Sequence, residues 1–345
     1  MKNEFEKELK HIMNEEKEMP VKVRESLDQS YAIIRAKSQK KKGNLIWKRI
    51  ATVACALIVT CVVLTNEQVM AGIHAFFNFG DKGVNRAVTE GFTQEDNSIA
   101  TDQNIKITLE RHFSDTNKIG MSFQLVFEDP AVLNNISEIS MDYRLKNGDG
   151  EYIEEFLPDT KPLKGDNSYM SGLDYHTSIL DSRTGQVQFD VLMDSHKGII
   201  PALKDAMIEI ESINLFYSIG ELKKIDGTWH LPVDNTFKDQ TNSIIEYVMN
   251  DTSSIIHVSS AKANPTSTNV IFSVNDIYQN ENTFAHHMKI VDEDGNEYQS
   301  NSGFSMEIKN NKTIISTNFP ITSYNNSKKL IFIVEGVGEA ELLKK

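Results

Sequence analysis

A few groups of residues in this 345-residue chain carry side chains that could bind a metal ion. The stretch DEDGNE at 292–297 contains part of a calcium-binding loop, but it lacks the alternating ligands of an EF-hand, and a charged hairpin turn explains it. His286 and His287 are adjacent, so on a strand they point to opposite faces and cannot chelate one ion. The two cysteines, Cys55 and Cys61, lie inside an apolar run. We therefore predict neither a metal site nor a cofactor.

The sequence also lacks the motifs of the common catalytic classes. GDKG at 80–83 is not a phosphate-binding loop, because no second Gly-Lys-Ser/Thr follows at the required spacing. Neither Gly-x-Ser-x-Gly nor His-Glu-x-x-His occurs. The many acidic residues could include two carboxylates for glycoside hydrolysis, but no spacing selects a pair. We predict no catalytic residues and no enzymatic activity, with a wall-active enzyme as a third alternative to the two functions given below.

An uncharged, apolar run from Ile50 to Thr65 predicts one transmembrane helix. Its sixteen residues contain no Gly or Pro. At the rise of an α-helix they cover about 24 Å, somewhat less than the bilayer core of about 30 Å. The preceding tryptophan suits the membrane interface, and long basic side chains can extend from there to the headgroups. We predict a membrane helix over 47–66, with these residues at its interface: Lys41, Lys42, Trp47, Lys48 and Arg49.

Two other interpretations of this run fit the sequence less well. Val69 to Ala71 would make a signal-peptide cleavage site, but about 49 residues with their own helical pattern precede the run, whereas a signal peptide has a short basic leader. A soluble core helix would show a polar stripe. This run offers only Thr52, Thr60 and Thr65, whose hydroxyls can bond back to their own helix.

Charge is distributed unequally on the two sides of the predicted membrane helix. Residues 1–49 hold thirteen Lys or Arg and eight Asp or Glu, a net charge of +5, whereas the remainder holds 23 and 41, a net charge of −18. The positive-inside rule places the N-terminus in the cytoplasm and residues 67–345 outside the cell. Next to a membrane helix, the basic run is expected to face lipid headgroups, so we predict no direct contact with nucleic acid.

The first 46 residues have the pattern of two short helices separated by Pro20. Apolar residues recur at helical spacing, which gives each helix one apolar face. The segment is too small to bury these faces in its own core, so we predict that they lie in a groove of a partner protein. A pair of frayed helices or a juxtamembrane support is the alternative. The predicted partner-binding residues are Phe5, Leu9, Ile12 and Met13, then Val23, Leu27, Tyr31 and Ile34.

Residues 67–99, behind the membrane helix, are expected to form a juxtamembrane helical segment. Asp81 can cap a short helix, and Gly91 can end it. The apolar face of that helix would consist of Val84, Ala87 and Val88.

From about residue 100 the hydrophobic pattern has the period of two that is typical of strands. The stretch 104–127 predicts a hairpin around Ser114–Asn117, and 139–156 predicts strands flanking an Asn-Gly-Asp-Gly turn. Further strands are expected in GQVQFDVLM and AMIEIESINLFYS. All of these strands are short and bounded by turn residues, which is typical of antiparallel β proteins.

This strand pattern repeats further along the chain. Residues 253–274 match the first hairpin, and 286–300 match 140–154 with Tyr152 and Tyr298 in equivalent places. Two units with turn signals about every ten residues predict a mainly β fold, with two tandem antiparallel β-sandwiches after the helical tail and membrane helix. The predicted domains are a first sandwich at 100–220, a linker at 221–245 and an immunoglobulin-like second sandwich at 246–345.

The order of tail, membrane helix, FGDKGVNRAVTEGFTQ (79–94) and ITLERHFSDTNKIGMSFQL (107–125) resembles the membrane-anchored anti-sigma factors of low-GC Gram-positive bacteria. The resemblance covers essentially the whole chain. It implies an outer domain of unknown function followed by an immunoglobulin-like domain, and a tail that sequesters an extracytoplasmic-function sigma factor. Zinc-binding tails of this kind carry His-x-x-x-Cys-x-x-Cys. This tail has His11 and no Cys, so a zinc-type tail is not expected.

We therefore predict a single-pass regulator of transcription in the cell membrane. Its expected partners are an extracytoplasmic-function sigma factor, the lipid bilayer and a protease that releases the sigma factor. The alternative is an extracellular ligand-binding or adhesion module that the same helix anchors.

Overall fold

The computed structural model describes the part of the chain that follows the predicted membrane helix. The described residues are 76–77, 79–157, 162–165, 169–196, 199–233, 244–250, 255–278, 283–285, 287–300 and 303–345. The predicted tail (1–46) and membrane helix (47–66) lie outside them. Among the described residues, α5 (Lys82–Thr89) is the one α-helix, and none is long and apolar enough to cross a bilayer. The described part is mainly β, as predicted.

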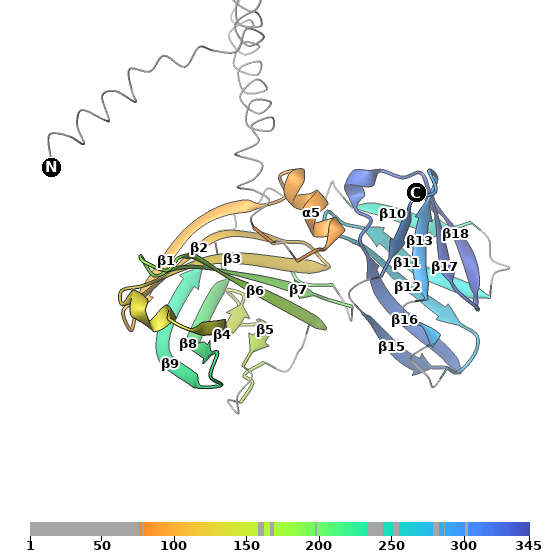
Figure 1. Ribbon diagram of the computed structural model, residues 1–345. Coiled ribbons are helices and arrows are strands. Elements are labelled where there is room, and N and C mark those ends of the chain that lie inside the picture. Colours follow the sequence, from red (N-terminus) through yellow and green to blue (C-terminus); the bar gives the residue numbers. More distant parts are fainter. Residues whose placement is uncertain are drawn as a thin grey trace, which may run out of the picture. The chain divides into compact units, whose positions relative to one another are not determined.

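The first sandwich consists of two antiparallel sheets that lie one above the other (Figure 1). The five-stranded sheet has the order β1-β2-β3-β7-β6, and the four-stranded sheet has the order β5-β4-β8-β9. The strands are β1 (Gln94–Asp102), β2 (Ile105–Ser114), β3 (Lys118–Phe127), β4 (Ile136–Lys146), β5 (Tyr152–Phe156), β6 (Gly172–Asp181), β7 (Gln186–Asp194), β8 (Met207–Tyr217) and β9 (Leu222–Pro232).

Apolar side chains at alternate positions of these strands form the core between the two sheets. Leu109, Phe123 and Phe189 lie on neighbouring strands of the five-stranded sheet and are at most 1 % exposed. From the other sheet, the Trp229 indole donates a hydrogen bond to the Ile105 carbonyl at 2.9 Å. The two predicted hairpins are confirmed as β2–β3 and β4–β5, because both combine a period of two with turn residues.

The second sandwich is one continuous antiparallel sheet with the order β14-β13-β17-β18-β10-β11-β12-β16-β15. Phe272 on β12 and Phe332 on β17 are four places apart in this order, yet their ring centroids are 4.8 Å apart. The sheet must therefore fold over so that its two halves face each other. Its strands are β10 (Ile245–Met249), β11 (Ile256–Ala263), β12 (Thr268–Val274), β13 (Met288–Asp292), β14 (Glu297–Gln299), β15 (Phe304–Lys309), β16 (Lys312–Phe319), β17 (Lys329–Val334) and β18 (Gly338–Lys344).

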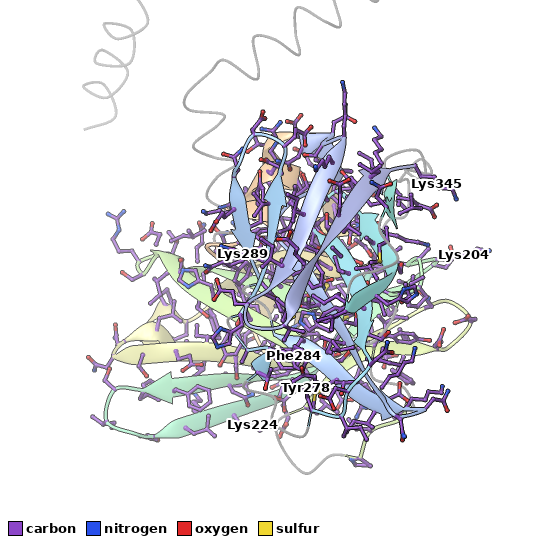
Figure 2. All side chains as sticks on the ribbon, turned by 90° about the vertical axis from the view of Figure 1, so that its right-hand side faces the viewer. Lys204, Lys224, Tyr278, Phe284, Lys289 and Lys345 are labelled. Atoms are coloured by element: carbon purple, nitrogen blue, oxygen red, sulfur yellow. The ribbon has the colours of Figure 1, made fainter. Side chains whose placement is uncertain are left out.

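Aromatic rings fill much of the second core. Tyr278 and Phe284 lie next to each other, with ring centroids 5.2 Å apart (Figure 2). Phe284 also contacts Phe272 at 6.2 Å and Phe304 at 6.4 Å. The edge-to-face geometry of these pairs matches the positive edge of one ring to the negative face of the next.

The strand order of the two sandwiches confirms the predicted repeat. The orders β1-β2-β3-β7-β6 and β5-β4-β8-β9 correspond to β10-β11-β12-β16-β15 and β14-β13-β17-β18, strand for strand. A bulge recurs as well. In the first sandwich Leu109 lies opposite Phe123 and Arg111 lies opposite Ser122, so Glu110 is the extra residue. In the second sandwich, Ser259 is the extra residue after the pair of Val258 and Phe272, 149 positions further on.

Two predicted boundaries are wrong. The stretch 221–245 is not simply a linker, because β9 (Leu222–Pro232) is the edge strand of the four-stranded sheet. Of its side chains only Trp229 and Leu231 are buried, so its apolar pattern is weak. The predicted helical segment 67–99 is also too long, because β1 begins at Gln94. Strands at sheet edges bury one face at most, which makes such segments polar in sequence.

The predicted equivalence of Tyr152 and Tyr298 is also wrong. Leu145 and Ile290 each lie two residues before their turn, and they pair with Glu154 and Tyr298, respectively. Glu154 is therefore the residue that corresponds to Tyr298. The cause is a register shift in β5 next to Tyr152, and a shift by one residue moves a side chain to the other face of a strand.

Candidate functional site at the junction of segment 76–92 with the two sandwiches

The residues that follow the predicted membrane helix are packed on the outer face of the five-stranded sheet. We call residues 76–77 and 79–92 the docked segment. Within it, Asp81 caps α5 as predicted, since its Oδ1 accepts hydrogen bonds from the backbone N–H groups of Gly83 at 2.8 Å and Val84 at 3.0 Å. Gly91 follows the helix with φ +81°, which glycine adopts at no steric cost. The buried side chains are Phe77, Val84, Ala87, Val88 and Phe92, packed against Phe113 and Leu192 of the sheet.

Phe77 is attached to the sheet through both its side chain and its backbone. Its side chain has 0 % exposure, and its ring centroid lies 5.0 Å from that of Phe113 in an edge-to-face arrangement. Its backbone N–H donates a hydrogen bond to Asp190 Oδ2 at 3.2 Å. The neighbouring ring of Phe76 lies under the guanidinium of Arg111, 5.0 Å from its centroid. Both aromatic residues therefore attach the start of the segment to the sheet.

Asp190 is a buried carboxylate on β7 that receives several hydrogen bonds. Ser122 Oγ donates to it at 2.5 Å, and the Gln188 side-chain amide donates at 3.0 and 3.1 Å. Burial raises the pKa of Asp190, and its hydrogen bonds to Ser122, Gln188 and Phe77 act in the opposite direction. The Asp190 carboxylate thus accepts a hydrogen bond from the backbone N–H of Phe77, which would otherwise be buried without a partner.

A second attachment is a buried group of charges, which we call the Lys118 clamp. Lys118 Nζ lies 2.5 Å from Asp81 Oδ2 on the docked segment and 2.8 Å from Asp194 Oδ2 at the end of β7. The side chain of Lys118 is 3 % exposed. Burial alone would lower the pKa of Lys118, but the two carboxylates outweigh it and raise the pKa, so Lys118 stays charged. Two carboxylates on different elements are thus held by one ammonium.

The second sandwich reaches the same place through two equivalent hairpin turns. The β2–β3 turn closes with Asp115 and Lys118, and the β11–β12 turn closes with Asn264 and Ser267, again 149 positions further on. Asp115 Oδ2 accepts hydrogen bonds from Thr266 N at 2.9 Å and Thr266 Oγ1 at 2.6 Å. Burial raises the pKa of Asp115, and the bonds from Thr266 oppose that shift. The two turns therefore contact each other directly through hydrogen bonds.

Further contacts connect this pair of turns with the Lys118 clamp. Asn318 Nδ2 on β16 donates to Asp194 Oδ1 at 2.5 Å, so Asp194 binds both Lys118 and the second sandwich. Gly83 on α5 lies against the Thr266 carbonyl, since a Cβ there would come within 2.1 Å of that oxygen. The docked segment is thus in contact with both sandwiches.

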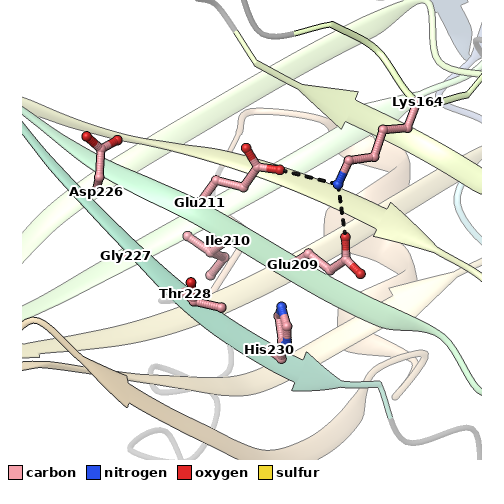
Figure 3. Close-up of a pocket in the computed structure, with 8 residues that line it drawn as sticks. All are labelled: Lys164, Glu209, Ile210, Glu211, Asp226, Gly227, Thr228 and His230. Carbon is pink, nitrogen blue, oxygen red and sulfur yellow. Dashed lines mark ion pairs between the residues drawn. The ribbon is translucent and has the colours of Figure 1, made fainter.

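A groove on the four-stranded sheet is the second candidate site. It has a volume of about 660 Å³ and is lined mainly by polar side chains of β8, β9 and the loop before β6. Lys164 Nζ lies 4.0 Å from Glu209 and 3.8 Å from Glu211. Dashed lines in Figure 3 mark these two ion pairs. Arg144, beneath this surface, donates to Glu211 Oε1 at 2.8 Å and pairs with Glu155. Mixed charges of this kind could bind a polar or charged ligand.

The structure tests only some of the residues that the sequence singled out. The predicted partner-binding residues (Phe5 to Ile34) and membrane-interface residues (Lys41 to Arg49) lie outside the described part, as does His286. The carboxylate of Asp292 accepts hydrogen bonds from Asp294 N, Asn296 N and Tyr298 Oη, which is the pattern of a hairpin turn. Among the described residues, no group of His, Cys, Asp and Glu is arranged to hold a metal ion.

Sequence reasoning identified Asp81 as a cap but not its second role. The sequence contains no sign of four further polar residues of this site, because each is an isolated polar residue that lies far along the chain from its partner. These are Lys118, Asp190, Asp194 and Asn318. The separation is 37 residues between Asp81 and Lys118 and 124 between Asp194 and Asn318. The one available signal was the alternation of inner and outer positions along a strand. On β7 it places Asp190 on the outer face, where the docked segment lies.

Comparisons with known proteins found one family model that matches part of the chain and a similar solved structure. Over residues 41–126 the chain matches a protein family described as a domain of unknown function (DUF4179). That range contains the apolar run, the docked segment, β1, β2 and most of β3. The comparison with curated proteins found no match. Among solved structures, the chain is similar to the crystal structure of the conserved domain protein from Bacillus anthracis, with a TM-score of 0.44 and 16 % identity over 70 % of this chain and 77 % of that chain.

Proposed function

We propose that the protein is a membrane-anchored anti-sigma factor whose outer β region controls its cytoplasmic tail. Residues 1–46 bind an extracytoplasmic-function sigma factor, residues 47–66 cross the cell membrane once, and the two sandwiches, the second immunoglobulin-like, lie outside the cell. The observation that carries the proposal is the docked segment. It begins ten residues after the predicted membrane helix and is attached to both sandwiches through Lys118, Asp194 and Thr266.

The attachment suggests how a change outside the cell reaches the membrane. A flexible tether would absorb a movement of the sandwiches, whereas a segment with buried Phe77 and a buried ion pair moves with them. The family match is consistent with a functional link between the membrane helix and the first sandwich. It extends from the basic flank of the apolar run through the docked segment into β3. Release of the sigma factor follows either from that movement or from proteolysis near the membrane.

The strength of tail binding is consistent with sequestration. Burying an apolar side chain contributes roughly 1.5–3 kcal/mol. Four to six such residues support submicromolar binding if about half of that energy remains after the helices are ordered.

The decisive experiment changes the apolar face of the tail in the full-length protein. We expect Leu27→Asp together with Tyr31→Asp to release the sigma factor and to induce its target genes, measured as the transcript profile of the host. Gln29→Asp, on the predicted polar side of the same helix, is the matched control and should leave the profile unchanged. The proposal is wrong if the double variant is present in the membrane at the normal level and the profile is also unchanged.

The groove on the four-stranded sheet favours a second candidate, an extracellular ligand-binding or adhesion module. Its volume of about 660 Å³ is in the range of small-ligand sites. This function predicts that deletion of residues 1–40 leaves activity intact, whereas removal of 246–345 abolishes it. The anti-sigma function predicts that the first deletion abolishes repression.

A further inference from the structure

Strand β6 offers an unpaired edge of the first sandwich. It pairs with β7, and among the described residues no other strand pairs with its second side. The strand is ten residues long and contains neither proline nor lysine, which commonly protect such edges, and its pairing with β7 is regular from Gly172 to Ile179, with a bulge only at Leu180 near its end. Two apolar side chains near its end are strongly exposed, Ile179 at 44 % and Leu180 at 50 %. Such an edge presents a row of backbone donors and acceptors to another strand.

The other edges of this sandwich are better protected. The edges of β1 and β9 lie against each other, where the Asp102 carboxylate accepts a hydrogen bond from Thr228 N at 2.8 Å. Strand β5 has only five residues, and its Glu154 carboxyl shares the inner face with its partner Leu145. Short strands and inward charges both discourage edge pairing. The long edge of β6 is therefore an exception within its own domain.

We propose that β6 pairs antiparallel with β6 of a second copy of this chain, around a two-fold axis that is perpendicular to the sheet and passes midway between His176 and its copy. The β7 partners fix the faces of the strand, because Leu173, Tyr175, Thr177 and Ile179 pair with buried core residues. Antiparallel partners share a face. An axis at His176 sets Leu173 opposite Ile179 of the second copy, and Tyr175 opposite Thr177. The exposed Ile179 then gains an apolar partner.

The position of the docked segment favours a second copy as the occupant of this edge. The segment covers the outer face of the five-stranded sheet, where it packs on Phe113 and Leu192. A two-fold axis perpendicular to the sheet leaves the outer faces of both copies on the same side. Both docked segments then lie on the same side of the ten-stranded sheet, as two chains anchored in one membrane would require. The choice of a second copy rests on the membrane anchor of the proposed function, whereas the pairing does not depend on what the tail binds.

Disulfide crosslinking of the full-length protein in membranes tests this arrangement. Cys55 and Cys61, the two cysteines of the chain, are replaced by Ala, and single cysteines are then introduced on β6. His176→Cys places the two thiols opposite each other and should give a disulfide-linked dimer. Asp174→Cys and Ser178→Cys should not do so alone, because each lies about 13 Å along the strand from its own copy. Co-expression of these two variants should give the crosslink, since Asp174 lies opposite Ser178 of the second copy.

The controls separate pairing from chance collision. Asp226→Cys, on β9, should give roughly tenfold less dimer than His176→Cys. Adding Ile179→Lys to His176→Cys should abolish the crosslink, whereas adding Ile308→Lys, on the corresponding edge strand β15 (48 % exposed), should not. The proposal is overturned if His176→Cys links no better than Asp226→Cys, or if Asp174→Cys and Ser178→Cys link as well alone as together. None of these readouts requires the sigma factor, so failure here leaves the proposed function untouched.

Discussion

The first and second sandwiches have the same nine strands in the same order, but they use equivalent positions differently. At the end of the hairpin turn, the first has the buried cation Lys118 and the second has Ser267. On the outer face of the equivalent strands β4 and β13, Arg144 is buried whereas Lys289 is partly exposed. The first sandwich therefore holds charges inside the protein at places where the second holds neutral or solvated groups.

Buried charges are costly, so this difference indicates a task specific to the first sandwich. An ion pair removed from water is rarely more stable than packed apolar residues, but it fixes geometry, because one misplaced partner leaves a charge uncompensated. Around Lys118, that geometry determines where the docked segment lies. The second sandwich has no such segment among its described residues and contributes through Thr266 and Asn318.

The largest effect is expected from removal of the central cation. Lys118→Met leaves Asp81 and Asp194 buried without their partner and should lower the free energy of unfolding by about 3–5 kcal/mol. Ser267→Ala, at the equivalent position, removes one hydrogen bond from Asn117 and should cost about 1 kcal/mol. Urea unfolding followed by the fluorescence of Trp229, which is buried in the first sandwich, measures both. Equal losses would remove the distinction between the two turns.

Loss of a cation from the outer face of β4 should lower the stability more than the same change on the equivalent strand β13. Arg144→Met leaves Glu155 and Glu211 without their buried partner and is expected to cost about 3 kcal/mol. Lys289→Met breaks pairs with Glu297 and Glu335 near the surface, where water screens the charges, and should cost much less than Arg144→Met. Thermal unfolding of both variants at low and high salt provides the measurement. Comparable losses at both sites would contradict the comparison.

Glu154, the counterpart of Tyr298, should make the first sandwich sensitive to pH. Burial raises the pKa of Glu154 to about 7, so the native state keeps a proton that the unfolded state loses at lower pH. Stability is therefore highest below about pH 4.5 for this group and falls as pH rises to 7, by about 2 kcal/mol after allowance for partial exposure. Glu154→Gln should remove this slope in urea unfolding at a series of pH values. Glu128→Gln, at an exposed site, should retain it.

The smallest effect concerns the two tyrosines. Tyr298→Phe removes the hydrogen bond from its hydroxyl to Asp292 Oδ2, 3.0 Å long, and should cost about 1 kcal/mol. Tyr152→Phe keeps the ring that lies 6.0 Å from the ammonium groups of Lys146 and Lys164, so a change within about 0.5 kcal/mol is expected. Matched thermal unfolding experiments decide this. The reverse ranking would contradict the difference in hydrogen bonding between the two tyrosines.

Most of the central strands could be predicted because their signals are local. The stretch KIGMSFQLVF alternates and follows a turn, and it is β3 in the structure. Strand β9 was not recognised, because only Trp229 and Leu231 of its eleven residues are buried. Strand β6 was missed for a similar reason, as an edge strand without a fully buried residue. Edge strands have few buried neighbours, so their periodicity is weak.

The candidate site was predictable only where chemistry and local structure coincide. Asp81 was identified because a capping carboxylate precedes its helix directly. Its contact with Lys118 joins the docked segment to the first sandwich. The contact of Asp194 with Asn318 joins the first sandwich to the second. Nothing in a single sequence specifies which distant polar residues meet, because that depends on how the sheets are stacked.

By itself, the sequence determined the elements: the apolar run, the capped helix, the hairpins and the repeat of two β units. These follow from periodicity, turn residues and capping, which act over a few neighbouring residues. The tertiary structure decided the rest. It placed Glu154 at the position in the first sandwich that Tyr298 occupies in the second. It also brought two equivalent turns together and surrounded Lys118 with two carboxylates. Such contacts depend on strand register and on the packing of one layer against another, where a shift of one residue changes which side chains meet.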